Sequence, residues 1–191
     1  MHHHYLLNKP HSCLSQFRHQ HTTRRNKRML GALYDFAPGT MSVGRLDEHS
    51  EGLLLLTTDG KISAAITSRK YEKEYYVELD GLITDEAINR LQQGVEIGFD
   101  GKRYQTTPCE ARRLDPAPKF SFPPRRQRGA SHGPTSWVAI TIREGKYRQV
   151  RKMTAAVGFP TVRLIRVRIG HWELGDLAAG AVIELPELRL D

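Results

Sequence analysis

The chain has 191 residues, and its 29 lysines and arginines exceed its 21 aspartates and glutamates, giving a formal charge of +8 at pH 7. This length suits one domain with a substantial core, and such an excess of positive charge indicates a polyanionic partner, most commonly nucleic acid. No apolar run approaches the ~20 residues of a membrane helix, no secretory signal core follows Met1, and two lone cysteines suit a reducing compartment. We therefore expect a cytoplasmic protein without a membrane segment.

The N-terminus combines a histidine run with a strand. The histidines at positions 2–4 are either native or the remnant of a purification tag, so they carry no argument for a metal site. Residues 5–10 predict a short strand that ends at Pro10, because proline lacks the N–H that a strand ladder needs.

A basic run follows at residues 18–28, and it includes Arg24 and Arg25. Such a run is usually a solvated loop, but it also fits an arm that becomes ordered on RNA phosphates. The next residues, 29–36, predict a short helix that ends before Pro38.

Residues 41–60 contain the most informative stretch of the chain. A strand at 41–43 leads into a loop with one carboxylate, Asp47, and then into four consecutive leucines at 53–56. The leucine run predicts a buried strand, because it is too short for a lone helix and is closed by the turn residues Asp59 and Gly60. Asp47 is either a turn former or a reactive group mounted on a rigid loop.

The segment 73–79 predicts a second strand from its aromatic and β-branched residues. Alternation along the strand places Tyr75, Val77 and Leu79 on one face, with Lys73 in line. A tyrosine on such a face is most often a core residue whose hydroxyl is hydrogen-bonded.

The elements around this strand are expected to form the scaffold. Helices are predicted at 61–68 and at 84–93, where Thr84 is the expected N-cap and Gly94 ends the helix. Short strands are predicted within 95–114, around the hairpin turn at Asp100 and Gly101.

Residues 115–136 are rich in proline and contain the basic group Arg125, Arg126 and Arg128. A segment of this kind is either a linker or a functional insertion. Because regular structure resumes directly afterwards, with a strand at 137–143, we favour an insertion that contacts RNA.

A helix is predicted from residue 146 to Gly158. Arg148, Arg151 and Lys152 share one stripe of this helix, and Val150, Met153 and Val157 lie opposite. Cations are unfavourable at the positive end of a helix, so this stripe is expected to face an anion, either Asp47 or RNA phosphates. Further strands are predicted at 162–169 and 182–185.

Three motifs resemble those of the pseudouridine synthases, in particular the branch that modifies ribosomal RNA. The first is Gly-Arg-Leu-Asp at 44–47, followed by Ser50, Gly52, the leucines and Asp59-Gly60. The second is Lys73-x-Tyr75-x-Val77. The third is Gly-x-x-Arg-Gln-Val-Arg-x-Met at 145–153. The resemblance extends from about residue 6 to residue 185, and it is weakest in the two basic loops.

This resemblance implies an α+β fold, with a mostly antiparallel mixed sheet bent between two lobes, flanking helices and a central RNA cleft. A single catalytic domain at 5–189 is expected, without the small S4-type RNA-binding domain that many relatives carry at their N-terminus. The implied activity is the isomerisation of a specific uridine to pseudouridine in ribosomal RNA, and we expect this RNA to be that of the large subunit.

The resemblance also implies roles for individual residues. Asp47 would be the nucleophile, Tyr75 would face the target base, and Arg151, with Arg148 as the alternative, would be the cation beside Asp47. We expect the Arg151 guanidinium within ion-pair reach of the Asp47 carboxylate, with Tyr75 at the same cavity. The RNA-binding candidates are Lys9, Arg24, Arg25, Arg45, Lys73, Arg125, Arg126, Arg128, Lys146, Arg148 and Lys152.

An isomerisation involves no net oxidation or hydrolysis, so no cofactor and no metal are expected, and ribosomal RNA is the expected partner of a monomer. Two other classes compete with this interpretation. A non-catalytic RNA-binding or ribosome-assembly protein fits the charge but does not require Asp47. A metal-dependent RNA enzyme is disfavoured, because the sequence lacks the zinc signature of the deaminases.

Overall fold

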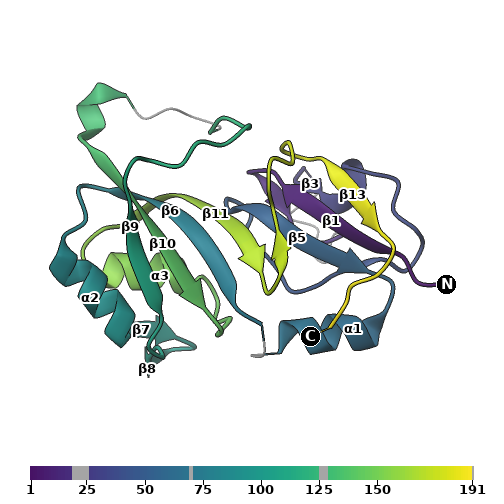
Figure 1. Ribbon diagram of the computed structural model, residues 1–191, viewed down its shortest axis with the longest axis horizontal. Helices are drawn as coiled ribbons and strands as arrows, with labels where there is room; N and C mark the ends of the chain where they lie inside the picture. Colours follow the sequence, from purple (N-terminus) through teal and green to yellow (C-terminus); the bar gives the residue numbers. More distant parts are fainter. Residues whose placement is uncertain (19–25, 69–70, 125–128, 191) are drawn as a thin grey trace. The chain divides into compact units, whose positions relative to one another are not determined.

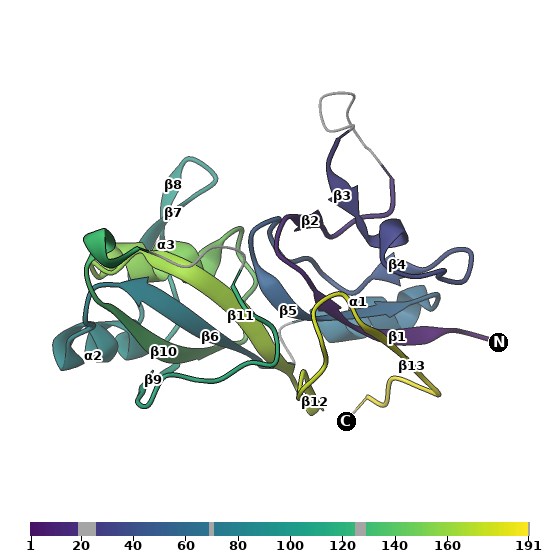
Figure 2. The ribbon, with the colours of Figure 1, turned by 90° about the horizontal axis from the view of Figure 1, so that it is seen from above.

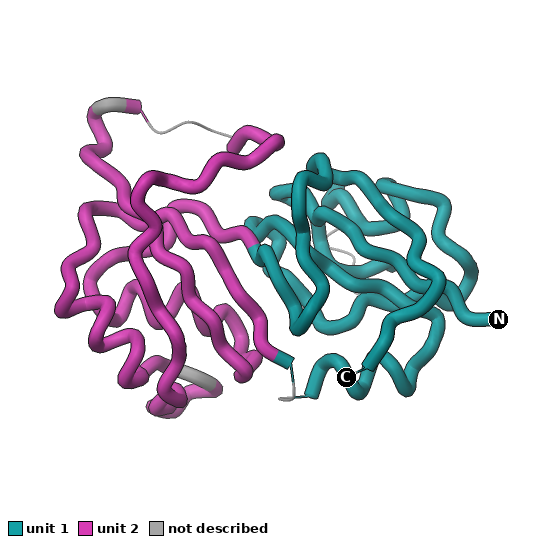
Figure 3. Tube along the Cα trace, viewed as in Figure 1, with its two compact units in different colours: residues 1–71, 166–191 teal, residues 72–165 magenta. Residues whose placement is uncertain are grey.

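The computed structural model describes residues 1–18, 26–68, 71–124 and 129–190. The chain forms two compact units (Figures 1 and 3). Unit 1 comprises Met1–Tyr71 and Arg166–Asp191, and unit 2 comprises Glu72–Ile165. Strand β11 (Thr161–Ile169) begins in unit 2 and ends in unit 1.

Unit 1 is built around β1, which pairs antiparallel with β13 on one side and β5 on the other. β5 is followed in the sheet order by β11, while β4 pairs antiparallel with β5 and β12 with β11. A separate parallel pair, β2–β3, lies above β1 and β13 in Figure 2. The strands are β1 (His4–Lys9), β2 (Cys13–Leu14), β3 (Arg28–Met29), β4 (Met41–Ser42), β5 (Glu51–Thr57), β12 (Trp172–Glu173) and β13 (Val182–Leu185).

The four leucines of β5, residues 53–56, are fully buried, as predicted. Leu54 and Leu56 pack with Tyr5 and Leu7 of β1, with Phe36 among the half-buried side chains at the border of this cluster. Because the sheet is covered on both faces here, β5 has a continuous apolar run instead of alternation. The predicted strands at 5–10 and 41–43 are likewise confirmed as β1 and β4.

The helix predicted at residues 29–36 is wrong. The chain instead forms β3 and then one 3₁₀ turn at Leu30–Ala32. The backbone N–H of Leu30 donates to the Gln16 carbonyl, 3.1 Å away, and the side chain of Leu30 is fully buried. A hydrogen bond to a distant segment and burial in the core therefore override the local preference for helix.

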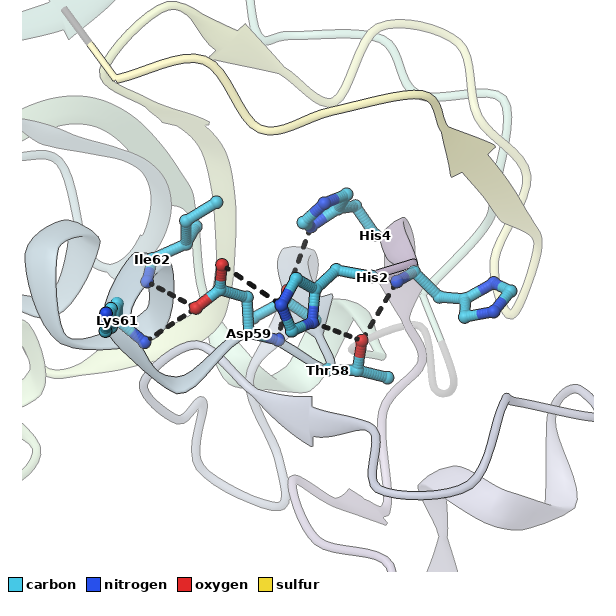
Figure 4. Close-up of polar contacts among 8 residues, drawn as sticks. His2, His4, Thr58, Asp59, Lys61 and Ile62 are labelled. Atoms are coloured by element: carbon cyan, nitrogen blue, oxygen red, sulfur yellow. Dashed lines mark hydrogen bonds and ion pairs between the residues drawn. The ribbon is translucent and has the colours of Figure 1, made fainter.

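Helix α1 (Gly60–Thr67) confirms the helix predicted at 61–68, and Asp59 is its N-cap (Figure 4). Asp59 Oδ1 accepts from the backbone N–H groups of Lys61 at 2.8 Å and Ile62 at 3.3 Å. Burial opposes the ionised form, but these two hydrogen bonds lower the pKa of Asp59. A ring nitrogen of His2 lies 3.7 Å from its other carboxylate oxygen.

His4 is the first residue of β1, one position earlier than the predicted strand. Its ring is buried, and its Nδ1 lies 2.9 Å from the hydroxyl of Thr57. Burial lowers the pKa of His4, although the charge of Asp59 opposes this shift. The neutral imidazole is therefore favoured in the folded state.

The buried His4 predicts a stability that falls at mildly acidic pH. Between its lowered folded pKa and about 6.5, the unfolded chain binds the proton more readily than the folded chain, so acidification through this window favours unfolding. We expect the free energy of unfolding, from urea titrations at pH 7 and pH 5, to decrease less in His4→Gln than in the wild type. The exposed His171→Gln is the control, and an equal pH dependence in His4→Gln would contradict the prediction.

Unit 2 has β10 at its centre, paired antiparallel with β6 and with β9, and β11 follows β6 in the sheet order. The hairpin β7–β8 forms a separate antiparallel pair around the predicted turn. The elements are β6 (Lys73–Asp80), α2 (Asp85–Gln93), β7 (Glu96–Phe99), β8 (Lys102–Gln105), β9 (Glu110–Leu114), β10 (Thr135–Ile142) and α3 (Gln149–Ala156). The expected α+β class is confirmed.

Helix α2 begins and ends at the predicted caps. The hydroxyl of Thr84 accepts from the Ala87 N–H at 3.2 Å, and Gly94 ends the helix with a φ of +88°. A Cβ at position 94 would lie 2.3 Å from the Thr106 carbonyl oxygen. Gly94 is thus required both for its left-handed backbone and for close approach to the segment before β9.

The insertion after β9 covers one face of the unit 2 sheet with its first part. The Phe120 ring lies 5.9 Å from Trp137 of β10 and 6.3 Å from Tyr76 of β6. The Arg163 guanidinium of β11 lies 5.5 Å from the rings of both Phe120 and Phe122. The segment 115–124 therefore packs as part of the fold, and the basic residues 125–128 lie outside the described residues.

Candidate active site

The loop between β4 and β5 in unit 1 carries Asp47. Asp47 is half-buried, and its carbonyl accepts from the Ser50 N–H at 3.1 Å, which closes a turn directly before β5. Gly52 enters the strand with a φ of +105°, a conformation that glycine adopts without strain. The neighbouring Arg45, an RNA-binding candidate, is exposed.

Two residues that flank Asp47 are held by hydrogen bonds. The hydroxyl of Ser15 donates to the Leu46 carbonyl at 2.7 Å and accepts from the Leu46 N–H at 3.0 Å. On the other side, the Glu48 carbonyl accepts from the Cys13 N–H at 3.3 Å. The Glu48 carboxylate pairs with Lys27 Nζ at 2.7 Å. The backbone on both sides of Asp47 is therefore tied to the segment that follows β1.

The buried side chain of Lys9 also holds the backbone beside Asp47. Its side chain is fully buried, and Nζ donates to the carbonyls of Cys13 at 2.7 Å, Pro10 at 2.9 Å and Glu48 at 3.3 Å. Burial lowers the pKa of Lys9 to about 8, against the opposing charges of the carboxylates Glu51 and Asp47. The ammonium of Lys9 is thus enclosed and bonded to the backbone, which favours a structural role, and its contact with RNA stays a prediction.

In unit 2, β6 carries Tyr75 and Lys73. The side chain of Tyr75 is 9% exposed and lies on the same strand face as Val77 and Leu79, as the alternation predicted. Ile140 of β10 is its cross-strand neighbour. Lys73 Nζ donates to the Arg143 carbonyl at 3.2 Å, so this half-buried lysine also joins β6 to the end of β10.

Helix α3 begins at Gln149, later than predicted. Arg148 is its N-cap and has a left-handed backbone with a φ of +51°, so it does not lie on the helix with Arg151 and Lys152. The predicted common stripe of three cations is therefore wrong at Arg148. Arg151 and Lys152 lie in the first turn and are half-buried. The opposite side of the helix is buried as predicted, through Val150, Met153 and Val157.

Comparisons with known proteins agree with these motifs. Residues 3–156 match the family model described as RNA pseudouridylate synthase. The match contains Asp47, Tyr75 and Arg151.

This chain belongs to the RNA pseudouridylate synthase family.

Relatives of this synthase include ribosomal large subunit pseudouridine synthase E from Xanthomonas axonopodis pv. citri (strain 306), which is 44% identical over 177 residues. That alignment covers 91% of this chain and 88% of the relative. The protein of the same name from Vibrio parahaemolyticus serotype O3:K6 (strain RIMD 2210633) is 41% identical, with 92% of this chain and 70% of the relative covered. A crystal structure of a pseudouridylate synthase matches with a TM-score of 0.76 at 29% identity, covering 97% of this chain and 70% of that one.

The candidate residues of this synthase are divided between its units. Asp47 and Arg45 belong to unit 1, whereas Tyr75, Arg148 and Arg151 belong to unit 2. The RNA-binding candidates that lie outside the described residues are Arg24, Arg25, Arg125, Arg126 and Arg128. No helix within the described ranges is long and apolar enough to cross a membrane.

The structure adds three residues that the sequence analysis did not select. Glu144 and Gln149 are buried at the two ends of the loop before α3. Tyr147, in the same loop, is 68% exposed, and Lys152 Nζ lies 5.4 Å from its ring centroid. The position of Tyr147 between two cations was visible in the sequence, but no pattern indicated that a carboxylate at 144 would be buried.

Lys9 can be tested as a structural residue. Lys9→Met removes the ammonium from three carbonyls, of which that of Glu48 keeps the Cys13 N–H as a donor. Each buried acceptor that loses its partner costs about 1–3 kcal/mol. The loss is partly offset, because methionine does not carry the cost of burying an ammonium. We expect a clear decrease in the free energy of unfolding by urea titration, and little change in the exposed control Lys61→Met.

The same variant distinguishes structure from RNA contact. At temperatures where Lys9→Met is folded, the salt dependence of its RNA affinity should equal that of the wild type. A slope reduced by about one unit of log K per log salt would show that Lys9 does meet a phosphate.

Proposed function

We propose that this synthase converts one specific uridine of large-subunit ribosomal RNA to pseudouridine, with Asp47 as the nucleophile. The observation that carries the proposal is the loop of Asp47, where a half-buried carboxylate is held at both neighbouring residues immediately before a fully buried strand. The names of the similar synthases from Xanthomonas and Vibrio support large-subunit ribosomal RNA as the substrate.

The reaction is an isomerisation, so all atoms of the uridine are conserved in the product. The N1–C1′ bond breaks, the uracil turns, a C5–C1′ bond forms, and the C5 proton is lost while N1 gains one. An ionised carboxylate at Asp47 can attack C1′, attack C6, or assist elimination to a glycal. Each route requires one ionised carboxylate, and none requires an electron carrier, so the proposal includes no cofactor and no metal.

Arg151 is the cation that we assign to Asp47, with Arg148 as the alternative. Arg151 lies in the first turn of α3, where a cation is unfavourable unless an anion balances it. The left-handed backbone of Arg148 likewise indicates a residue held in place by its surroundings. We assign Tyr75 to the face of the target base, which must leave its stack to be turned.

The RNA contacts that we propose among the described residues are Arg45, Lys73, Lys146, Arg148 and Lys152. Tyr147 lies between two of these cations, and its exposed ring offers a surface on which an unpaired base can stack. Positive charge around an exposed aromatic ring is the usual composition of a surface that binds single-stranded RNA. We further propose that the protein acts as a monomer in the cytoplasm.

Replacement of Asp47 tests the catalytic assignment. Asp47→Asn keeps the size of the side chain but removes the charge, so pseudouridine formation should fall below detection while RNA affinity stays within about twofold. The assay is tritium release from a large-subunit RNA transcript labelled at C5 of uridine. Glu48→Gln is the neighbouring control and should retain activity. Turnover by Asp47→Asn at a rate near that of the wild type would refute the assignment.

The cationic surface predicts how RNA affinity responds to salt. Arg45→Gln and Lys146→Gln should each make the slope of log K against log salt less steep, by about 0.7–0.9 per lost phosphate contact. Arg189→Gln, at an exposed site near the C-terminus, is the control. An affinity and slope equal to those of the wild type in both variants would exclude these two residues from the RNA-binding surface.

A further inference from the structure

Glu144 is a buried carboxylate that accepts hydrogen bonds from neutral groups. It lies two residues after β10 and is 2% exposed. Its Oε2 accepts from the Thr107 N–H at 3.0 Å and from Gln149 Nε2 at 2.8 Å, and its Oε1 accepts from the Tyr104 hydroxyl. Burial alone would raise the pKa of Glu144, but these hydrogen bonds lower it. Both oxygens of the ionised group are thus satisfied without an ion pair among these contacts.

Gln149 connects Glu144 to the start of α3. Gln149 is 3% exposed, and its Oε1 accepts from the Lys146 N–H at 3.1 Å while its own N–H donates to the Lys146 carbonyl at 3.0 Å. Hydrogen bonds from Gln149 to Glu144 and to Lys146 therefore join the two ends of the loop 144–149. Arg148 is part of this loop and has a left-handed backbone.

The loop 144–149 and the first turn of α3 also contact the β7–β8 hairpin. Tyr104 belongs to β8, and Lys146 Nζ lies 4.9 Å from its ring centroid. Lys152, in the first turn of α3, donates from Nζ to the Gly98 carbonyl of β7 at 2.7 Å. Both ends of the short stretch that carries Arg148 and Arg151 are therefore joined to one hairpin.

We propose that Glu144 is a positioning residue: through Gln149 and Tyr104 it determines where Arg148 and Arg151 are held for the reaction. The left-handed conformation of Arg148 is disfavoured for any residue other than glycine, and it persists only where neighbouring contacts impose it. Glu144 does not contact Arg148 directly but holds Gln149, whose Oε1 accepts from the Lys146 N–H on the other side of Arg148. This inference rests on the proposed function, because it assigns the support of the cations that act there.

The test begins with Glu144→Gln, which keeps the volume but replaces one accepting oxygen with an NH₂ group, so that position 144 can no longer accept from all three donors. We expect kcat for pseudouridine formation to fall about 10- to 100-fold, as displaced catalytic groups do, with KM for the RNA changed much less. Glu86→Gln, on the exposed surface of α2, is the matched control and should behave as the wild type.

The exchange Glu144→Gln/Gln149→Glu provides the decisive variant. In this variant a carboxylate again contacts a carboxamide, but the charge lies at position 149 instead of 144. We therefore expect kcat to return most of the way to the wild-type value. Tyr104→Phe removes a single donor and keeps the ring, and it should lower kcat in the same direction but less. In both single variants, NMR should show shifted amide signals for residues 146–151.

The outcomes separate positioning from simple stabilisation. If kcat per folded molecule is unchanged in Glu144→Gln and in Tyr104→Phe, while only the melting temperature falls, the proposal is overturned. It is also overturned if the exchange variant regains thermal stability without regaining kcat. An inactive wild-type protein would instead refute the proposed function and leave these hydrogen bonds as a structural feature.

Discussion

The structure depends first on the constraint placed on the loop of Asp47. Under the proposed function, the Asp47 carboxylate must be held in one geometry, yet it cannot lie in the middle of a strand, where its side chain would be enclosed. The chain meets both needs with Ser15 bonded to Leu46, Lys9 bonded to Glu48, and the buried leucines of β5 directly behind. Asp47 itself remains half-buried and accessible.

Each unit contains a buried charged side chain that makes three hydrogen bonds, and the two charges are of opposite sign. In unit 1 the buried ammonium of Lys9 donates to three carbonyls around the Asp47 loop, and in unit 2 the buried carboxylate of Glu144 accepts from three donors around the α3 loop. A buried charge is costly unless every hydrogen bond is made, so each group strongly favours one arrangement of its loop. In each unit, a buried charge therefore stabilises the backbone beside a half-buried candidate residue, Asp47 in unit 1 and Arg148 in unit 2.

Much of the fold could be predicted from the sequence because local and tertiary preferences agree. The leucine run of β5, the caps of α2 and the buried side of α3 follow from patterning. Local pattern was insufficient where a distant contact decides the outcome. Leu30 bonds to Gln16 and leaves the helical conformation, Lys9 is buried despite its charge, and Arg148 adopts a left-handed backbone enclosed by the Glu144 hydrogen bonds. For the site, the motifs singled out the residues that we propose to be reactive, but no pattern indicated the buried groups beside them, Lys9 and Glu144.

The most direct measurement of the central claim is a map of pseudouridines across the ribosomal RNA of cells with and without this gene. Chemical modification of pseudouridine followed by primer extension reads every position at once. The account predicts that one pseudouridine in large-subunit RNA is lost without the gene and returns when the wild-type chain is supplied. An unchanged map, or a loss confined to other RNAs, would contradict it.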